Sequence, residues 1–308
     1  MLLYSDPRFL SHITGSHPEN AGRIVAIEKM LTETALPGKC TRGEVNPVSQ
    51  ESLLAVHGPG MLAKTESLAE KGGGRLDPDT VVSPKSFEIA KLAAGAACEA
   101  VERVAAGDDT RAVCLIRPPG HHALADRAMG FCLMNNVAIA ARHAQRVCGL
   151  GRLLIIDWDV HHGNGTQDIF YDDDSIGFFS IHRFPFYPGS GDRDETGTGR
   201  GLGTTWNLPI SMGTPRESFL KSFESSLNAA IQKMKPELIL LSAGFDAHRL
   251  DPIGSLGLET EDFGTLTQMV KSAALAECDG RIVSLLEGGY DPKALADSVQ
   301  IHLNELMK

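Results

Sequence analysis

Four apolar runs, each leading directly into a polar, glycine-rich loop, constrain the fold of this chain most strongly. The runs are AVCLI (112–116), RLLIID (152–157), LILLSAG (238–244) and RIVSLLEGG (281–289), and SIGFFSIH (175–182) is a fifth candidate. Their apolar residues are continuous rather than alternating, which is typical of parallel strands covered on both faces.

Helical patterns separate these runs. They cover residues 83–107, 136–149, 215–234 and 259–278, and the first two end on glycine, a frequent residue at helix C-termini. Strands that alternate with helices predict an α/β fold, in which a mostly parallel sheet carries helices on both faces. The chain has 308 residues without a low-complexity linker or a repeat, so we expect one domain spanning residues 1–308.

Composition excludes several classes of partner. The net charge of −10 argues against a general nucleic-acid binder, which needs a basic face. No segment approaches the ~18 apolar residues of a membrane helix, and the N-terminus MLLYSDPRFL does not read as a signal peptide. The six cysteines form no C-x-x-C pair, which favours buried free thiols in a reducing compartment. We therefore expect a cytoplasmic protein.

The loops after the four main runs carry the polar residues. They read RPPGHHA (117–123), DWDVHHGNG (157–165), GFDAHRLDP (244–252) and EGGYDP (287–292). Ligands of open parallel sheets bind outside the carboxyl ends of the strands. We therefore expect these four loops to converge on one active site.

The loop DWDVHHGNG predicts a metal site. If the strand stays extended, Asp157, Asp159 and His161 share one face. Two carboxylates near a core repel each other and lose hydration, and a bound cation removes that problem. Asp246 supplies a third acid from another strand, although such an aspartate alone is more often a cap. An Asp–His–Asp set leaves a position for water, as catalytic zinc sites do, whereas a solvated polar loop is the alternative.

The adjacent histidines predict proton transfer. His121 and His122 would supply a proton acceptor and a cationic neighbour. Asp157 could orient one imidazole and Asn164 the other; a carboxylate favours the imidazolium more than an amide does. Tyr290 follows two glycines and could polarise a substrate carbonyl, although alone it could equally be a structural tyrosine.

Taken together, the motifs resemble the zinc-dependent histone deacetylase family, which has the arginase/deacetylase fold. The matching segments are RPPGHHA, GFCLMNN, DWDVHHGNG, SAGFDAHRLDP and EGGYD, in the family's order, and SHPENAGR near the start is similar to a family segment. Within the family, Asn164 and the segment SAGFDAH are most similar to the class II group and its bacterial relatives.

The resemblance implies roles at the matching positions. One zinc ion would be bound by Asp159, His161 and Asp246. His122 would act as general base and acid beside His121, and Tyr290 would bind the acyl oxygen. Asp157 and Asn164 would hydrogen-bond the two histidines. A potassium ion would involve Asp157, Asp159, main-chain oxygens of His161 and Ile181, and Ser180. The channel for an acyl-lysine stem would involve Phe131, Tyr187, Gly130 and Ile253.

The resemblance also bears on the substrate. Relatives that deacetylate polyamines carry a glutamate after the Asp-Pro pair, where this chain has Ile253. This favours acyl-lysine in proteins or peptides over acetylpolyamines. A rim aspartate that holds the substrate backbone would be Asp77 or Asp79.

Three alternatives remain open at this point. A deacetylase of small acylated amines would use the same site. A ureohydrolase with two manganese ions would lack the histidine pair of RPPGHHA and Tyr290. A catalytically silent acyl-lysine reader would be expected to have lost Tyr290 or a metal-binding acid, and this chain retains them.

Overall fold

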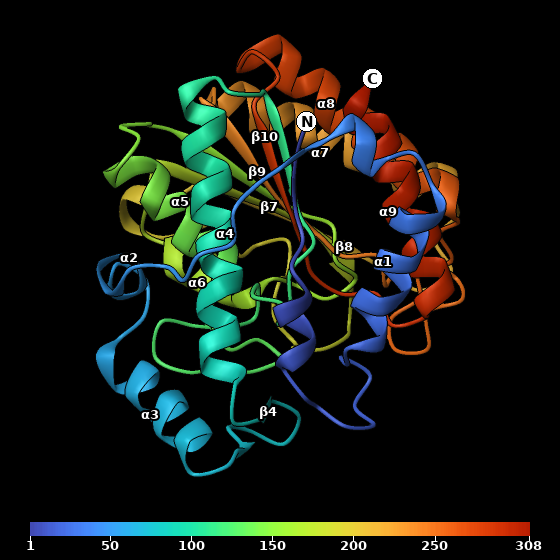
Figure 1. Ribbon diagram of the computed structural model, residues 1–308. Helices are drawn as coiled ribbons and strands as arrows, with labels where there is room; N and C mark the ends of the chain where they lie inside the picture. The colour runs from blue at the N-terminus through green and yellow to red at the C-terminus, as the bar shows by residue number, and fades with distance from the viewer.

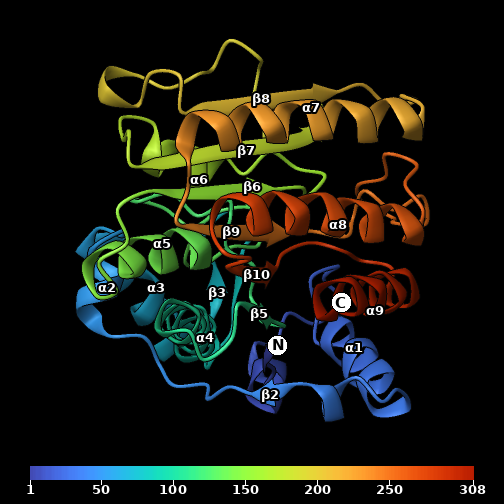
Figure 2. The same ribbon diagram turned by 90° about the horizontal axis from the view of Figure 1, so that it is seen from above.

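A single parallel sheet organises the protein. The computed structural model describes all residues, 1–308, and contains an eight-stranded sheet of order β2-β1-β5-β10-β9-β6-β7-β8 in which each neighbouring pair is parallel. Its strands are β1 (Leu2–Tyr4), β2 (Thr41–Arg42), β5 (Arg111–Cys114), β6 (Leu153–Asp157), β7 (Ile176–Arg183), β8 (Thr205–Ile210), β9 (Leu238–Ala243) and β10 (Ile282–Leu286). Two short strands, β3 (Gly74–Arg75) and β4 (Val81–Val82), form a separate antiparallel hairpin. Figure 2 shows the strand order from β8 through β7 and β6 to β9.

Helices cover both faces of the sheet. α4 (Ser86–Ala106) and α5 (Asn136–Arg146) pack on one face, whereas α1 (Gly22–Glu33), α7 (Arg216–Met234), α8 (Thr260–Glu277) and α9 (Pro292–Met307) pack on the other (Figure 1). The remaining helices are α2 (Gln50–Leu54), α3 (Pro59–Glu70), α6 (Asn164–Phe170) and the 3-10 turns η1 (Pro7–Ser11), η2 (Pro37–Lys39) and η3 (Gly199–Gly201). Two apolar clusters, one on each face, form the core. The prediction of an α/β fold with a doubly covered parallel sheet is therefore confirmed.

The predicted elements are present, with shifts at their ends. The run 281–289 was too long for a strand, because β10 ends at Leu286 and the residues from Glu287 onward form a loop. β8 was not predicted, because its sequence TWNLPI includes an asparagine and a proline. α9 was also missed, although Asp291 caps it and Pro292 begins it, both recognised signals of a helix start.

Strand register brings the four polar loops together. Asp157 at the end of β6 pairs with Ser242 of β9 and with Ser180 of β7. β10 lies between β9 and β5, and its last residues pair with Ala243 and Cys114. Because all of these strands are parallel, the loops that follow them leave from one edge of the sheet. None of the helices is long and apolar enough to span a membrane.

Candidate active site

Two carboxylates and one imidazole meet beyond the ends of β6 and β9. The ligand atoms of Asp159, His161 and Asp246 all lie within 4.8 Å of one another, and the three residues are buried. His161 Nδ1 is 3.0 Å from Asp159 Oδ1 and 3.1 Å from Asp246 Oδ2. Asp246 Oδ2 is buried and makes no hydrogen bond. Two buried carboxylates that share one imidazole nitrogen, with one oxygen making no hydrogen bond, are unfavourable without further positive charge, so this cluster fits a divalent cation that accepts oxygen and nitrogen ligands.

The loop after β6 brings Asp159 and His161 to Asp246 through a turn rather than through an extended strand. The three side chains would share one face only if the strand stayed extended through His161, and β6 ends at Asp157, where the predicted strand also ended. Beyond it, Asp157 Oδ1 accepts the Asp159 amide at 3.1 Å, and Asp159 Oδ1 accepts the His161 amide at 2.9 Å. These side-chain-to-backbone bonds turn the chain, so that Asp159 and His161 approach Asp246. The Asp157 carboxylate instead faces His121.

Gly288 allows another strand end to approach the same carboxylates. Its amide donates to Asp159 Oδ2 at 2.8 Å. A Cβ atom at this position would overlap Asp246 Oδ2 and come within 2.5 Å of Asp159 Oδ2. A side chain larger than hydrogen therefore does not fit at residue 288.

The tandem histidines contact different partners. His121 Nδ1 is 2.9 Å from Asp157 Oδ2, whereas His122 Nδ1 is 2.7 Å from Asn164 Oδ1. The Asn164 amide nitrogen donates to Met129 Sδ at 3.5 Å, which orients the amide oxygen toward His122. The centroids of the two imidazole rings are 4.0 Å apart.

These partners give the two imidazoles opposite charge preferences. Burial opposes a charge on His121, but the carboxylates of Asp157 and Asp159 overcome it and raise the pKa of His121 to about 10. Burial lowers the pKa of His122 well below its ordinary value, and His121 and His161 lower it further. A neutral His122 whose Nδ1 proton faces Asn164 has an unprotonated Nε2. The site therefore contains a base beside a cation.

Tyr290 lies close to Phe131, a residue predicted for the substrate channel. The two rings meet edge to face with centroids 5.8 Å apart. Burial raises the pKa of Tyr290 well above its ordinary value, so its phenol stays protonated and can donate a hydrogen bond. The Arg23 guanidinium lies over the Tyr290 ring, 5.0 Å from its centroid.

Two of the other predicted channel residues, Tyr187 and Gly130, lie beside His122. The Tyr187 ring is 5.2 Å from that of His122 and is 37% exposed. Gly130 has a φ of +58°, and a Cβ atom there would lie 2.5 Å from His122 Cδ2. Ile253 is half-buried in the loop that carries Asp246. The structure thus brings the residues predicted for the metal and the proton transfer together with three of the predicted channel residues, Phe131, Tyr187 and Gly130.

The residues predicted for potassium also adjoin one another. Ser180 and Ile181 belong to β7, and Ser180 pairs with Asp157 of the neighbouring β6. The Ser180 hydroxyl lies 2.9 Å from His182 Nδ1, and Asp159 is linked to Asp157 through its amide. At the rim, Asp77 Oδ1 accepts the amides of Asp79 and Thr80 in a tight turn.

Two further residues of the site, Phe186 and Glu287, were not predicted from the sequence. Phe186 stacks on His161, with ring centroids 5.2 Å apart. Glu287 is buried and accepts the Gly120 amide at 2.7 Å and the Ser242 hydroxyl at 3.0 Å. An acid directly after an apolar strand was the available signal for Glu287. Both Glu287 oxygens accept hydrogen bonds, whereas Asp246 Oδ2 in the first cluster makes none, so the group of Glu287, His121 and Cys132 is the weaker metal site.

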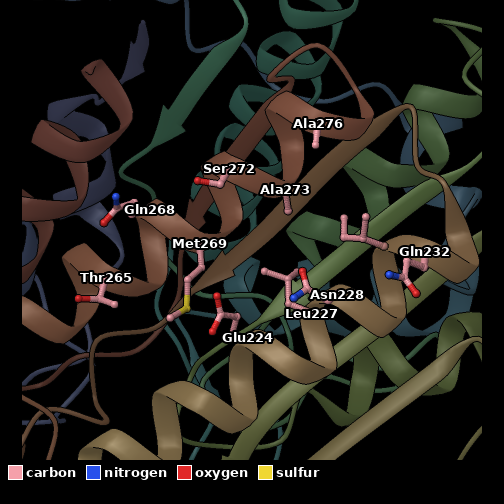
Figure 3. Close-up of a pocket in the computed structure, with 11 residues that line it drawn as sticks. Glu224, Leu227, Asn228, Gln232, Thr265, Gln268, Met269, Ser272, Ala273 and Ala276 are labelled. Atoms are coloured by element: carbon pink, nitrogen blue, oxygen red, sulfur yellow. The ribbon is translucent and has the colours of Figure 1, made fainter.

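A surface pocket elsewhere has no such chemistry. About 500 Å³ in volume, it lies between α7 and α8 (Figure 3). Glu224 is its one charged side chain, and the rest of its lining is neutral, including Met269 and Ala273. None of the predicted site residues lines it.

Known proteins are similar to this chain over nearly its whole length. The histone deacetylase domain model matches residues 17–306. A histone deacetylase-like amidohydrolase of Pseudomonas aeruginosa is 37% identical over 277 residues, covering 89% of this chain and 72% of that protein. A probable deacetylase of Methanothermobacter thermautotrophicus is 39% identical over 300 residues, covering 97% of this chain and 88% of the relative.

A plant relative and a solved structure are also similar to this chain over nearly its whole length. Histone deacetylase 14, chloroplastic, of Arabidopsis thaliana is 39% identical over 319 residues, covering 97% of this chain and 74% of that protein. The crystal structure of the HDA15 HD domain superposes with a TM-score of 0.94 at 33% identity, covering 99% of this chain and 87% of the other. The chain therefore belongs to the histone deacetylase family and is a deacetylase of the hydrolase class.

Proposed function

We propose that this chain is a zinc-dependent deacetylase that removes acetyl or other acyl groups from the ε-amine of lysine in proteins or peptides. The observation that carries the proposal is the Asp159–His161–Asp246 cluster, whose buried Asp246 oxygen has no hydrogen-bond partner. This donor set suits zinc. We further propose that residues 1–308 act as one catalytic domain.

Asp159, His161 and Asp246 would hold the zinc ion. When bound, the ion would polarise the substrate amide carbonyl and lower the pKa of a water molecule. We also assign a structural potassium ion to Asp157, Asp159, His161, Ser180 and Ile181. Its support is the adjacency of these residues at the ends of β6 and β7.

The chain's own residues would move the protons and hold the developing charge. His122 Nε2 takes a proton from the attacking water, because Asn164 engages the other ring nitrogen. The Tyr290 hydroxyl donates a hydrogen bond to the carbonyl oxygen as that atom becomes negative. The cationic His121, held by Asp157, stabilises the same charge. The proton on His122 then passes to the leaving amine, and a carboxylate and lysine are released.

The surroundings of the site favour a lysine side chain over a polyamine. Aromatic rings of Phe131 and Tyr187 adjoin the histidines and Tyr290, and such rings suit a long apolar stem. Ile253 places no carboxylate where a second amine would need one. We assign the rim aspartate to Asp79, because Thr80 beside it accepts the Phe131 amide at 3.2 Å. The six free cysteines support a reducing compartment such as the cytoplasm.

Two substitutions test the proposed roles. His122→Ala and Tyr290→Phe should each lower kcat on an acetyl-lysine peptide by about 100-fold or more. Both variants should keep their zinc content and unfolding temperature. Tyr4→Phe is the matched control, since it removes a buried hydroxyl without a hydrogen-bond partner from β1, which carries none of the four loops. Turnover near the wild-type level in either site variant would reject the assigned role.

A further inference from the structure

One carboxylate outside the site described so far joins the loop of Tyr290 to the loop of Asp246. Asp251 is 8% exposed, and its Oδ2 accepts the Tyr290 amide at 2.6 Å. Its Oδ1 accepts the amides of Ile253 and Gly254, each at 2.9 Å. None of these hydrogen bonds involves a metal-binding residue.

Asp251 is itself firmly held. The residues that follow Asp251 fold back toward the start of the same loop, where the Ser255 amide donates to the Asp246 carbonyl at 2.8 Å. Arg183 donates to the Gly254 carbonyl at 2.8 Å. The carboxylate therefore has a fixed position relative to Asp246.

The Tyr290 loop needs such an anchor. Residues 287–290 have no regular secondary structure, and Tyr290 follows two glycines, of which Gly289 has a φ of +124°. Glycine leaves the backbone a wide range of conformations. The charge-assisted hydrogen bond from the Tyr290 amide restricts that range directly at the residue that carries the phenol.

We propose that Asp251 is a positioning residue that holds Tyr290 in register with the metal-binding loop. The inference rests on the proposed role of Tyr290 in binding the acyl oxygen. A small displacement of an oxyanion donor costs much of its effect, because such donors act through fixed geometry. Asp251 thereby acts on the reaction through Tyr290 without touching the substrate.

Asp251→Asn is the informative substitution. The carboxylate serves three amides with two oxygens, whereas an asparagine has one acceptor oxygen and an amide group that would face an N–H donor. Asp262→Asn is the matched control, because Asp262 is also buried and accepts a backbone amide, from Glu259, but belongs to α8.

A double-mutant cycle with Tyr290→Phe separates positioning from general damage. We expect Asp251→Asn to lower kcat about tenfold with KM within about twofold. In the Tyr290→Phe background the same substitution should change kcat by less than about twofold. An equal loss in both backgrounds, or no loss in the wild-type background, would overturn the proposal. Asp262→Asn should leave kcat unchanged.

Amide hydrogen exchange gives a readout that does not depend on turnover. Asp251→Asn should speed exchange of the Tyr290 amide by about tenfold or more, and Asp262→Asn should not. Unchanged exchange would overturn the inference even in an active enzyme. An inactive wild-type protein would reject the proposed function instead, while the exchange result would still decide the placement of Tyr290. If Asp251→Asn does not fold, Asp251→Glu undergoes the same measurements with the same expectations.

Discussion

At the scale of single residues, the site depends on two neighbouring imidazoles with different partners. Asp157 accepts from His121, and Asn164 accepts from His122. A carboxylate stabilises an imidazolium, and an amide does so far less. The carboxylate of Asp157 thus keeps His121 protonated, whereas the amide of Asn164 leaves His122 free to act as a base at neutral pH.

Asn164→Asp should therefore weaken the base. A carboxylate beside His122 raises its pKa, so a larger fraction of His122 is protonated at a given pH. The acid limb of the pH profile of kcat/KM should move to higher pH by on the order of one unit. Asp168→Asn, an exposed change on the same helix, serves as the control. An unmoved acid limb in Asn164→Asp would argue against His122 as the base.

At the scale of elements, each strand end contributes a loop whose backbone comes unusually close to its neighbours. Gly288 brings the end of β10 against the carboxylates of Asp159 and Asp246. Gly130 brings its loop against the ring of His122. Space alone requires a glycine at 288, whereas at Gly130 both space and a φ of +58° require one.

Gly288→Ala should disrupt the metal site. Its methyl group would overlap Asp246 Oδ2 and crowd Asp159 Oδ2, so at least one carboxylate must move. We expect zinc affinity to fall by about tenfold or more, with kcat/KM reduced in parallel. Gly60→Ala in α3, where nothing lies within 4 Å of the added Cβ, should leave both unchanged. Wild-type zinc affinity in Gly288→Ala would contradict the tight packing at this position.

The sequence predicted the elements better than the paths of the loops. Continuous apolar runs identified β5, β6, β7, β9 and β10, because burial on both faces leaves a clear signal. β1 has three residues, too few for a pattern. Motif spacing predicted which side chains would meet, but the turn at Asp157 depends on its bond to the Asp159 amide. The role of Asp251 depends on contact with a distant segment, which no local pattern reports.

At the scale of the whole molecule, a buried ion pair fixes the N-terminal segment to the sheet. Arg117, which follows β5, donates to both Glu19 oxygens at 2.7 and 2.8 Å and to the carbonyls of Phe9 and His12. His12 Nε2 is 3.5 Å from Glu19, but burial lowers the pKa of His12 to about 4. Arg23 also donates to Glu19 Oε1 at 3.2 Å, so at neutral pH the charged partners of Glu19 are Arg117 and Arg23.

This pair predicts a pH dependence of stability. Burial alone would raise the pKa of Glu19, but Arg117 lowers it from 4.5 to about 2. The ion pair's contribution to the free energy of unfolding is fully present above pH 4.5 and is lost as the pH falls toward 2. The lowering of the Glu19 pKa corresponds to a contribution of about 3 kcal/mol. Glu19→Gln should reduce the free energy of unfolding at pH 7 by about 3–5 kcal/mol. Urea unfolding from pH 7 to 3 should show that this gap narrows below pH 4.5. A constant gap would contradict the assignment.

The central claim is that a divalent ion held by Asp159, His161 and Asp246 supports hydrolysis of acyl-lysine. Its most direct test is hydrolysis of an acetyl-lysine peptide, beside acetylputrescine and acetylspermidine, before chelation, after chelation and after zinc is restored. We predict peptide turnover that chelator abolishes and zinc restores, with little turnover of the polyamines. Turnover that is insensitive to chelator, or confined to the polyamines, would contradict the claim.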